Sequence, residues 1–515
     1  MRSTFMGLEA SKRGLFTQQS ALYTTGHNIA NANTAGYSRQ RVNMQPTLGF
    51  PGTGLNAPKT AGFIGTGVEA GSVQRIRDAF VDRQFRQESN KLGYWESRSQ
   101  AITQMEDIMS EPSDFGLNES LNQFWKSLQD LSTNPENSGT RKVVVQRGIA
   151  VADSFNYIHK QLSDIQGNLK NELVVSTDNI NSILDQIASL NEQIQSVEPN
   201  GYMPNDLYDA RDNLLDELSS YFPIEVAYEK TGGNALKVAE GTVTVSIKTA
   251  NGKMDVVKGK DAADLTLAGI NDNDNFEPFT SFTVIGNGST IMGGTITYGE
   301  LEVNKGKLLS LINSYGHGTV ASAKGFYPEM IAKLDRMATA FAEKFNEIHK
   351  KGFQLDSTTN GEDFFVIDPP ATVLNAGTIT VNTSIINDPS KLAASTASEE
   401  EGNGANALLL ANMKTEKIPG PGPTGLDNAT IQTFYQSMIG QLGVDGEQAN
   451  RLTYNSTTIK MAVENSRSSV SSVSLDEEMT NMITFQQAYN ASARMITVVD
   501  ETLDKIINGM GRVGL

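Results

Sequence analysis

The stretch SLDEEMTNMITFQQAYNASARMITVVDETLDKIINGM, residues 474–510, carries an apolar residue at one heptad position in six successive repeats. A seven-residue repeat places these side chains on one stripe of a helix, as in helices that pack against a partner helix. Met479, Ala493 and Ile507 partly fill a second stripe. We expect the main stripe to be an assembly interface. Its residues are Leu475, Met482, Tyr489, Ile496, Leu503 and Met510.

The N-terminal end carries a matching repeat. Residues 3–32 read as a helix with its own seven-residue stripe, and the Asn-rich segment 31–36 ends it, where Gly36 can take the left-handed conformation. Asn28 and Asn31 can belong to a solvated helix face, but in a packed helical assembly they would bond between helices and fix their register, as buried polar residues do in coiled coils. The apolar residues of the stripe are Leu8, Leu15, Leu22 and Ile29.

The two ends carry opposite charge. Residues 1–45 hold five basic residues and one acidic residue, a net charge of +4, whereas residues 471–515 hold three basic and six acidic residues, a net charge of −3. Helices of opposite charge attract each other. The ends are therefore predicted to pair, with the rest of the chain inserted between them.

How these ends become ordered has two interpretations. A single apolar stripe can belong to a surface helix packed on its own domain. A bare two-helix coil, however, buries little area and is marginal alone. We therefore hypothesise that residues 1–45 and 471–515 form a terminal coiled-coil domain that is disordered in the monomer and becomes the inner layer of an assembly.

Between the ends, helical spacing alternates with β spacing. Residues 46–222 and 318–470 are predicted to form a helical rod domain, which is irregular or extended at 46–72. The rod includes a block at about 140–197 that would reach on the order of 80 Å. Alternation with a period of two predicts an outer β-domain of short strands at 223–317, and a small β-patch lies near 363–387. The predicted fold is multidomain and mainly α, with long helical rods, a terminal coiled coil, an inserted all-β domain and a small β-patch.

Composition excludes several classes of function. The 515 residues favour roughly three or four domains. The formal charge of −17 disfavours nucleic acid or an anionic membrane as a partner. The absence of cysteine excludes disulfides and thiol nucleophiles, and the four histidines are scattered. No HExxH, GxSxG or Walker A motif occurs. We therefore expect no enzyme, no metal and no cofactor.

Both ends also carry recognisable motifs. The segment NIANANTAGYSRQR, residues 28–41, resembles the N-terminal signature of bacterial flagellar axial proteins, the rod, hook and hook-associated proteins. SLDEEM at 474–479, FQQAY at 485–489 and ITVVD at 496–500 resemble the matching C-terminal signature. The form of residues 36–41 and the ending INGMG at 507–511 favour the hook-associated members. The signature residues include Asn33, Thr34, Gly36, Tyr37, Arg39, Phe485 and Gln486.

The resemblance implies a structural role outside the cell. The chain would join hook to filament and would be needed for filament assembly. Its partners would be copies of itself, the hook protein, a second hook–filament junction protein and a cytosolic export chaperone on the C-terminal helix. Export would use the flagellar type III system, without a cleaved signal peptide. Another axial protein, such as hook or distal rod, is the alternative, and an enzyme carried on a flagellar scaffold is the third interpretation.

Overall fold

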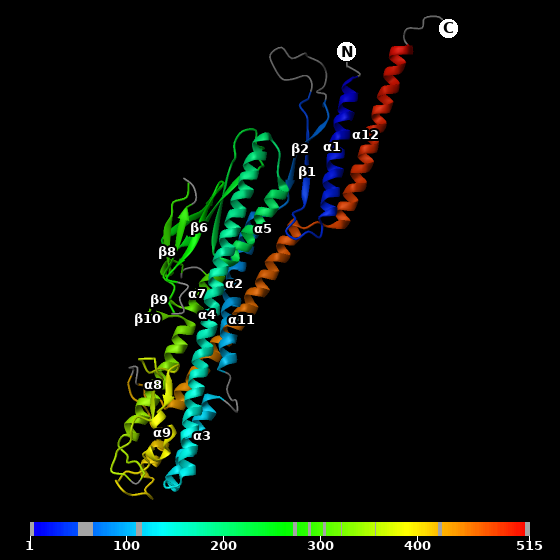
Figure 1. Cartoon of the computed structure of the whole chain (residues 1–515). Coiled ribbons are helices and arrows are strands. Elements are labelled where there is room, and N and C mark those ends of the chain that lie inside the picture. The colour runs from blue at the N-terminus through cyan, green and yellow to red at the C-terminus, as the bar shows by residue number, and fades with distance from the viewer. Residues whose placement is uncertain are drawn as a thin grey trace.

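The structure is a computed structural model that describes residues 5–49, 65–109, 116–270, 276–286, 290–301, 305–320, 322–355, 357–420 and 425–509. It is elongated, with long helices along most of its length and several small antiparallel sheets (Figure 1). The mainly α fold class predicted from helical spacing is confirmed.

The two ends of the chain lie side by side at one end of the molecule. Helix α1 (Phe5–Ala30) packs along α12 (Leu475–Gly509) (Figure 1). Strand β1 (Gln40–Pro46) pairs antiparallel with β2 (Val68–Arg75), and both strands contact α1. This strand pair includes half of the described part of segment 46–72, the segment expected to be irregular or extended.

Several long helices build most of the rod. They are α2 (Ala79–Ile108), α3 (Leu117–Thr133), α4 (Ser138–Val197), α5 (Asn205–Tyr221) and α11 (Ile431–Ser471). Helix α11 packs along α2, and α3 packs on α4. The 60 residues of α4 span about 90 Å at 1.5 Å per residue. Side-chain caps define where helices begin: Asp78 accepts from the Phe80 N–H at 2.8 Å, and Asn137 accepts from the Gly139 N–H at 2.7 Å.

A six-stranded antiparallel sheet packs against α4. Its strands follow chain order and are β3 (Ile224–Glu229), β4 (Thr242–Thr249), β5 (Gly252–Lys258), β6 (Asp261–Ala268), β7 (Ser281–Gly286) and β8 (Gly294–Thr297). The amide of Asn191 on α4 donates to the Val243 carbonyl at 2.9 Å and accepts from the Val243 N–H at 3.1 Å. This side chain therefore fixes the register of the sheet on the helix.

The last part of the predicted β segment is helical. After the short α6 (Tyr298–Leu301), residues Lys307–Tyr315 form α7, which packs on α2 and α4. The expectation of strands up to residue 317 is therefore wrong here. The physical reason is that Leu308, Leu311 and Ile312 have helical spacing and are fully buried.

The far end of the rod is built around α8 (Phe326–His349), which follows the short strands β9 (His317–Thr319) and β10 (Ser322–Lys324). Phe341 of α8 lies 6.2 Å from Phe124 and 4.8 Å from Phe365, measured between ring centroids. The remaining elements are short. They are strands β11 (Phe365–Ile367) and β12 (Ile379–Val381), helices α9 (Thr383–Asn387) and α10 (Ala405–Asn412), and the 3-10 turns η1 (Glu198–Asn200), η2 (Pro389–Lys391) and η3 (Met413–Thr415).

One hydrophobic cluster runs through the rod and the sheet. Its members extend from Tyr94 to Ala449, and in the described residues none comes from α1 or α12. The paired ends of the chain are therefore attached to the body by other contacts.

Candidate assembly interface

The pairing of α1 with α12 is antiparallel. A Cβ placed on Gly7 would lie 3.8 Å from Val499 Cγ2, and one on Gly14 would lie 3.3 Å from Ser492 Oγ. Asn28 Nδ2 donates to Glu478 Oε2 at 3.0 Å. A step of seven residues towards the C-terminus of α1, from Gly7 to Gly14, therefore matches a step of seven residues towards the N-terminus of α12, from Val499 to Ser492.

Small side chains on α1 permit this close approach. Gly7 and Gly14 are followed one heptad later by Ala21, which is 1% exposed. A helix contact lined with small residues brings the two backbones close together, and each helix then covers only a narrow stripe of the other. The pairing of the two ends, predicted from their heptads and charges, is the arrangement of the structure.

Most of the predicted interface residues are half-buried in the helix pair. Asn28 is buried, whereas Leu8, Leu15, Leu22, Ile29 and Asn31 are half-buried. On α12, Met482, Tyr489, Ile496 and Leu503 are half-buried, and Leu475 is 48% exposed. Met510 lies outside the described residues. Their role in contacts between subunits remains a prediction.

The second predicted stripe of α12 lies largely outside the contact with α1. Met479 is 57% exposed and Ile507 is 70% exposed, and a role for this stripe in contacts between subunits stays a prediction. The facing positions are Glu478, Ser492 and Val499. Two of these facing positions, Glu478 and Ser492, carry no hydrophobic signal in the sequence.

Much apolar surface of the pair faces outward. Helix α1 covers only one side of α12. In the described part of α12, Glu478 is the one buried side chain. Large exposed apolar clusters of this kind mark interaction sites. The residues are Phe5, Phe16, Tyr23, Met479, Ile483, Met495, Val498 and Ile507, and each is more than half exposed.

The turn after α1 ties the helix pair to the body. We call residues 31–39 the elbow. Gly36 has φ +76°, and a Cβ there would lie 2.0 Å from Asn213 Oδ1, so the position requires glycine. Tyr37 donates its hydroxyl to Asn28 Oδ1 at 2.9 Å. Burial, with Asp206 and Asp209 nearby, raises the pKa of Tyr37.

Arg39 closes the elbow onto the start of α12. Its Nε contacts Glu478 at 2.7 Å, its Nη1 contacts Glu477 at 2.7 Å, and its backbone N–H donates to the Ser471 carbonyl. The predicted signature thus has a structural explanation at Gly36, Tyr37 and Arg39. Four further signature residues do not take part in these contacts. Asn33, Thr34 and Gln486 are exposed, and Phe485 is half-buried.

Beside the elbow lies a buried ion cluster that sequence reasoning missed. We call it the arginine cluster: Arg75, Arg77, Arg86, Arg211 and Arg467 with Asp82, Asp209, Asp212, Asp216 and Glu240. These residues come from β2, α2, α5, α11 and the segments beside them. The spacing of Asp209, Asp212 and Asp216 on one face of α5 is the signal that could have indicated it.

Asp212 is the centre of the arginine cluster. It contacts Arg75 and Arg77 at 2.9 Å each and Arg86 at 3.1 Å. Burial alone would raise the pKa of Asp212, but Arg77, Arg75 and Arg86 hold it well below its usual value. Ser38 of the elbow donates to Asp209 at 2.6 Å, which connects the elbow to this cluster.

The described residues contain no group of acidic and histidine side chains arranged to hold a metal. Within that part of the chain, no helix has the length and apolar character required to cross a membrane. The site consists of helix faces that can contact other proteins and of ion pairs that hold these helices in place.

Family models match both ends and the body. The model "Flagella basal body rod protein" matches residues 8–37, and "Flagellar basal body rod FlgEFG protein C-terminal" matches residues 464–509. The model "Flagellar hook-associated protein FlgK helical domain" matches residues 102–365. The fold and its paired ends therefore define a flagellar axial protein.

Relatives narrow this class. The chain is 46% identical to the flagellar hook-associated protein 1 of Bacillus subtilis over 99% of both chains, and 26% identical to that of Salmonella typhimurium over 96% of this chain and 98% of the relative. It belongs to the flagellar hook-associated protein 1 family. The structure of the flagellar hook junction protein FlgK from Burkholderia pseudomallei shares the fold, with a TM-score of 0.58 and 14% identity over 75% of this chain and 100% of that chain.

Proposed function

We propose that this chain is a structural, non-enzymatic protein that joins the hook to the filament and on which the filament is assembled. Copies of the chain would form the junction at the cell exterior, in contact with hook protein on one side and with a second junction protein on the other. The proposal is supported by membership of the hook-associated protein 1 family.

One observation carries the mechanism: α1 and α12 pair, but they leave large apolar side chains exposed and contribute nothing to the hydrophobic cluster. Burying apolar surface contributes about 25 cal/mol per Å². Contacts between neighbouring α1–α12 pairs would therefore stabilise an assembly, while the free chain remains only weakly ordered at its ends. Stabilisation of this kind grows with the concentration of partners.

Export would follow from the same property. The chain would leave the cell unfolded through the flagellar type III system, and the absence of cysteine suits a chain that must be threaded. A cytosolic chaperone would cover the C-terminal helix before export. The exposed side chains of Met479 and Met495 are part of the apolar surface available to it.

The test changes an outward-facing apolar residue and leaves the pairing intact. Met495→Asp is expected to leave the purified chain folded and to block its incorporation into flagella, because Met495 is 54% exposed. Asn490→Asp, at an exposed polar position on the same helix, is the matched control and is expected to incorporate normally. Leu15→Asp and Ile496→Asp, within the pair, are expected to block incorporation as well. Normal filaments on the Met495→Asp variant would refute the mechanism.

A further inference from the structure

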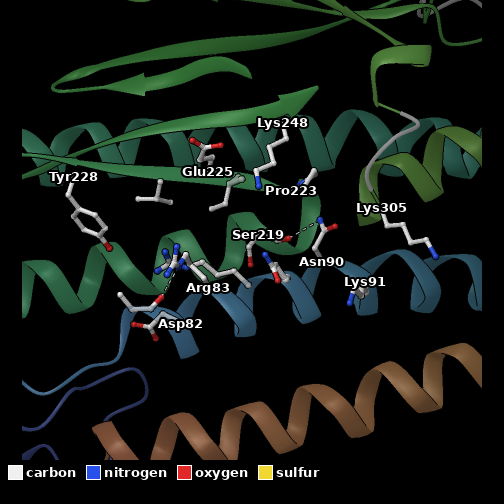
Figure 2. Close-up of a pocket in the computed structure, with 15 residues that line it drawn as sticks. Asp82, Arg83, Asn90, Lys91, Ser219, Pro223, Glu225, Tyr228, Lys248 and Lys305 are labelled. Carbon is white, nitrogen blue, oxygen red and sulfur yellow. Dashed lines mark hydrogen bonds between the residues drawn. The ribbon is translucent and has the colours of Figure 1, made fainter. Parts of the chain in front are cut away.

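A deep groove lies between α2 and the first strand of the sheet (Figure 2). Its volume is about 860 Å³, and β3 is the edge strand of the sheet, so the groove runs between that edge and α2. In Figure 2, Arg83, Asn90 and Lys91 come from α2, while Pro223 and Tyr228 come from the opposite wall. Ile224 and Val226 of this wall also pack against the hydrophobic cluster, whereas no residue of the elbow lines the groove.

The groove carries positive charge in an acidic chain. Five cationic and two acidic side chains line it: Arg83, Arg86, Lys91, Lys248, Lys305, Asp82 and Glu225. Arg86 and Asp82 belong to the arginine cluster, and Lys91 pairs with Glu88 at 2.7 Å. Glu225 pairs with Lys253 outside the groove, and among the described residues Arg83 and Lys305 form no ion pair, so the groove keeps an excess of cations. Partial burial together with the neighbouring cations Lys91 and Arg98 lowers the pKa of Lys305.

A complementary surface lies on α4. Asp178, Ser182, Asp185, Ser189 and Glu192 recur at intervals of four and three residues, and all five are exposed. We call these five residues the acidic stripe. No ion pair among the described residues includes its three carboxylates, and no stripe residue lines the groove.

The two surfaces have matching charge spacing. Asp178 and Asp185 are seven residues apart, or about 10.5 Å along the helix, while Arg83 and Lys91 are eight apart, or about 12 Å. Two runs of adjacent acidic residues serve less well: Glu399–Glu401 lies in a turn and cannot span two cations at that distance, and in Asp476–Glu478 the carboxylates of Glu477 and Glu478 already contact Arg39. The acidic stripe is therefore the better complement to the groove.

We propose that the groove between α2 and β3 receives the acidic stripe of α4 from a second copy of the chain. This inference rests on the proposed assembly function and identifies a lateral contact within it. The contact joins two different surfaces of identical chains, so it is heterologous and propagates into a ring or a helical array. Charge complementarity would also reject like-charged alignments of neighbouring rods.

Charge reversal tests the pairing in cells that lack the native chain. Asp178→Lys with Asp185→Lys is expected to lower the amount of chain in isolated flagella at least tenfold, and so is Arg83→Glu with Lys91→Glu. Combining all four changes is expected to restore it. Asn179→Lys with Gln186→Lys, exposed positions beside the acidic stripe, is the matched control and is expected to incorporate normally. Thermal unfolding of each purified variant checks that it folds.

Cross-linking tests the geometry directly, because the chain has no cysteine of its own. Gln87→Cys in the groove and Ser182→Cys in the acidic stripe, placed in one chain, are expected to give a ladder of cross-linked oligomers in oxidised, assembled flagella. Each single variant is expected to give no ladder. Normal incorporation of both charge-reversed variants, or assembled flagella without a ladder, would overturn this inference and leave the junction function standing. Absence of the native chain from the junction would instead overturn the proposed function.

Discussion

Glu478 connects the start of α12 to α1 and to the elbow. Its carboxylate accepts from Arg39 Nε at 2.7 Å and from Asn28 Nδ2 at 3.0 Å, and its side chain is 3% exposed. Hydrogen bonds to a charged group contribute about 1.5–3 kcal/mol. Arg39 keeps its second contact, to Glu477. We therefore expect Glu478→Gln to lower the free energy of opening the helix pair by about 2 kcal/mol.

Hydrogen exchange measures this local opening. Since about 1.4 kcal/mol corresponds to a factor of ten, the amides of α1 and α12 should exchange about 30-fold faster in the variant. Those of α2 and α4 should be unchanged, because the hydrophobic cluster of the body contains nothing from the helix pair. Glu477→Gln is the control: the Glu477 side chain is 62% exposed, so the expected loss is below about 1 kcal/mol. Equal acceleration in α2 and α12, or none in α12, would refute the reasoning.

Three further predictions concern the body and the elbow. Asp212→Asn should destabilise the chain by about 3 kcal/mol in urea unfolding, because three arginines lose a buried partner; an unchanged midpoint would contradict this role. His349 is fully buried, and burial lowers its pKa to about 4. The neutral side chain therefore stabilises the fold fully above pH 6.5, and the free energy of unfolding should fall by about 2 kcal/mol between pH 7 and pH 5. In urea titrations, a His349→Gln variant should be less stable at pH 7 and should lack this pH-dependent loss. Gly36→Ala should lower the free energy of unfolding by about 1–3 kcal/mol and disrupt the elbow, which faster hydrogen exchange of the α12 amides would show. Gly26→Ala is the control: nothing lies within 4 Å of the new Cβ, so this change should be neutral or slightly stabilising.

Periodicity predicted the long elements well. The block at about 140–197 is α4, and the heptads at both ends are α1 and α12, because long amphipathic repeats leave few alternatives. Opposite charge at the two ends indicated their pairing. The side of α12 that faces α1 was harder to predict, since Gly14 and Ser492 carry little hydrophobic signal although they lie at the contact.

The contacts that position the helix pair could not be read from local pattern. Arg75, Asp212 and Arg467 are far apart in sequence, and each resembles a solvated charge until the fold brings them together. The motif that contains Gly36 and Arg39 was recognised, but its physical reason depends on Asn213 and Glu478. Long-range polar contacts of this kind become visible only in the structure.

The central claim is that the chain forms the junction on which the filament grows. Electron microscopy of cells lacking the chain tests it most directly, with flagellin measured in the medium. The account predicts hooks of normal length without filaments and flagellin shed outside the cell, with filaments restored by the native chain and absent with Met495→Asp. Filaments of normal length on the hooks of deletion cells would contradict it.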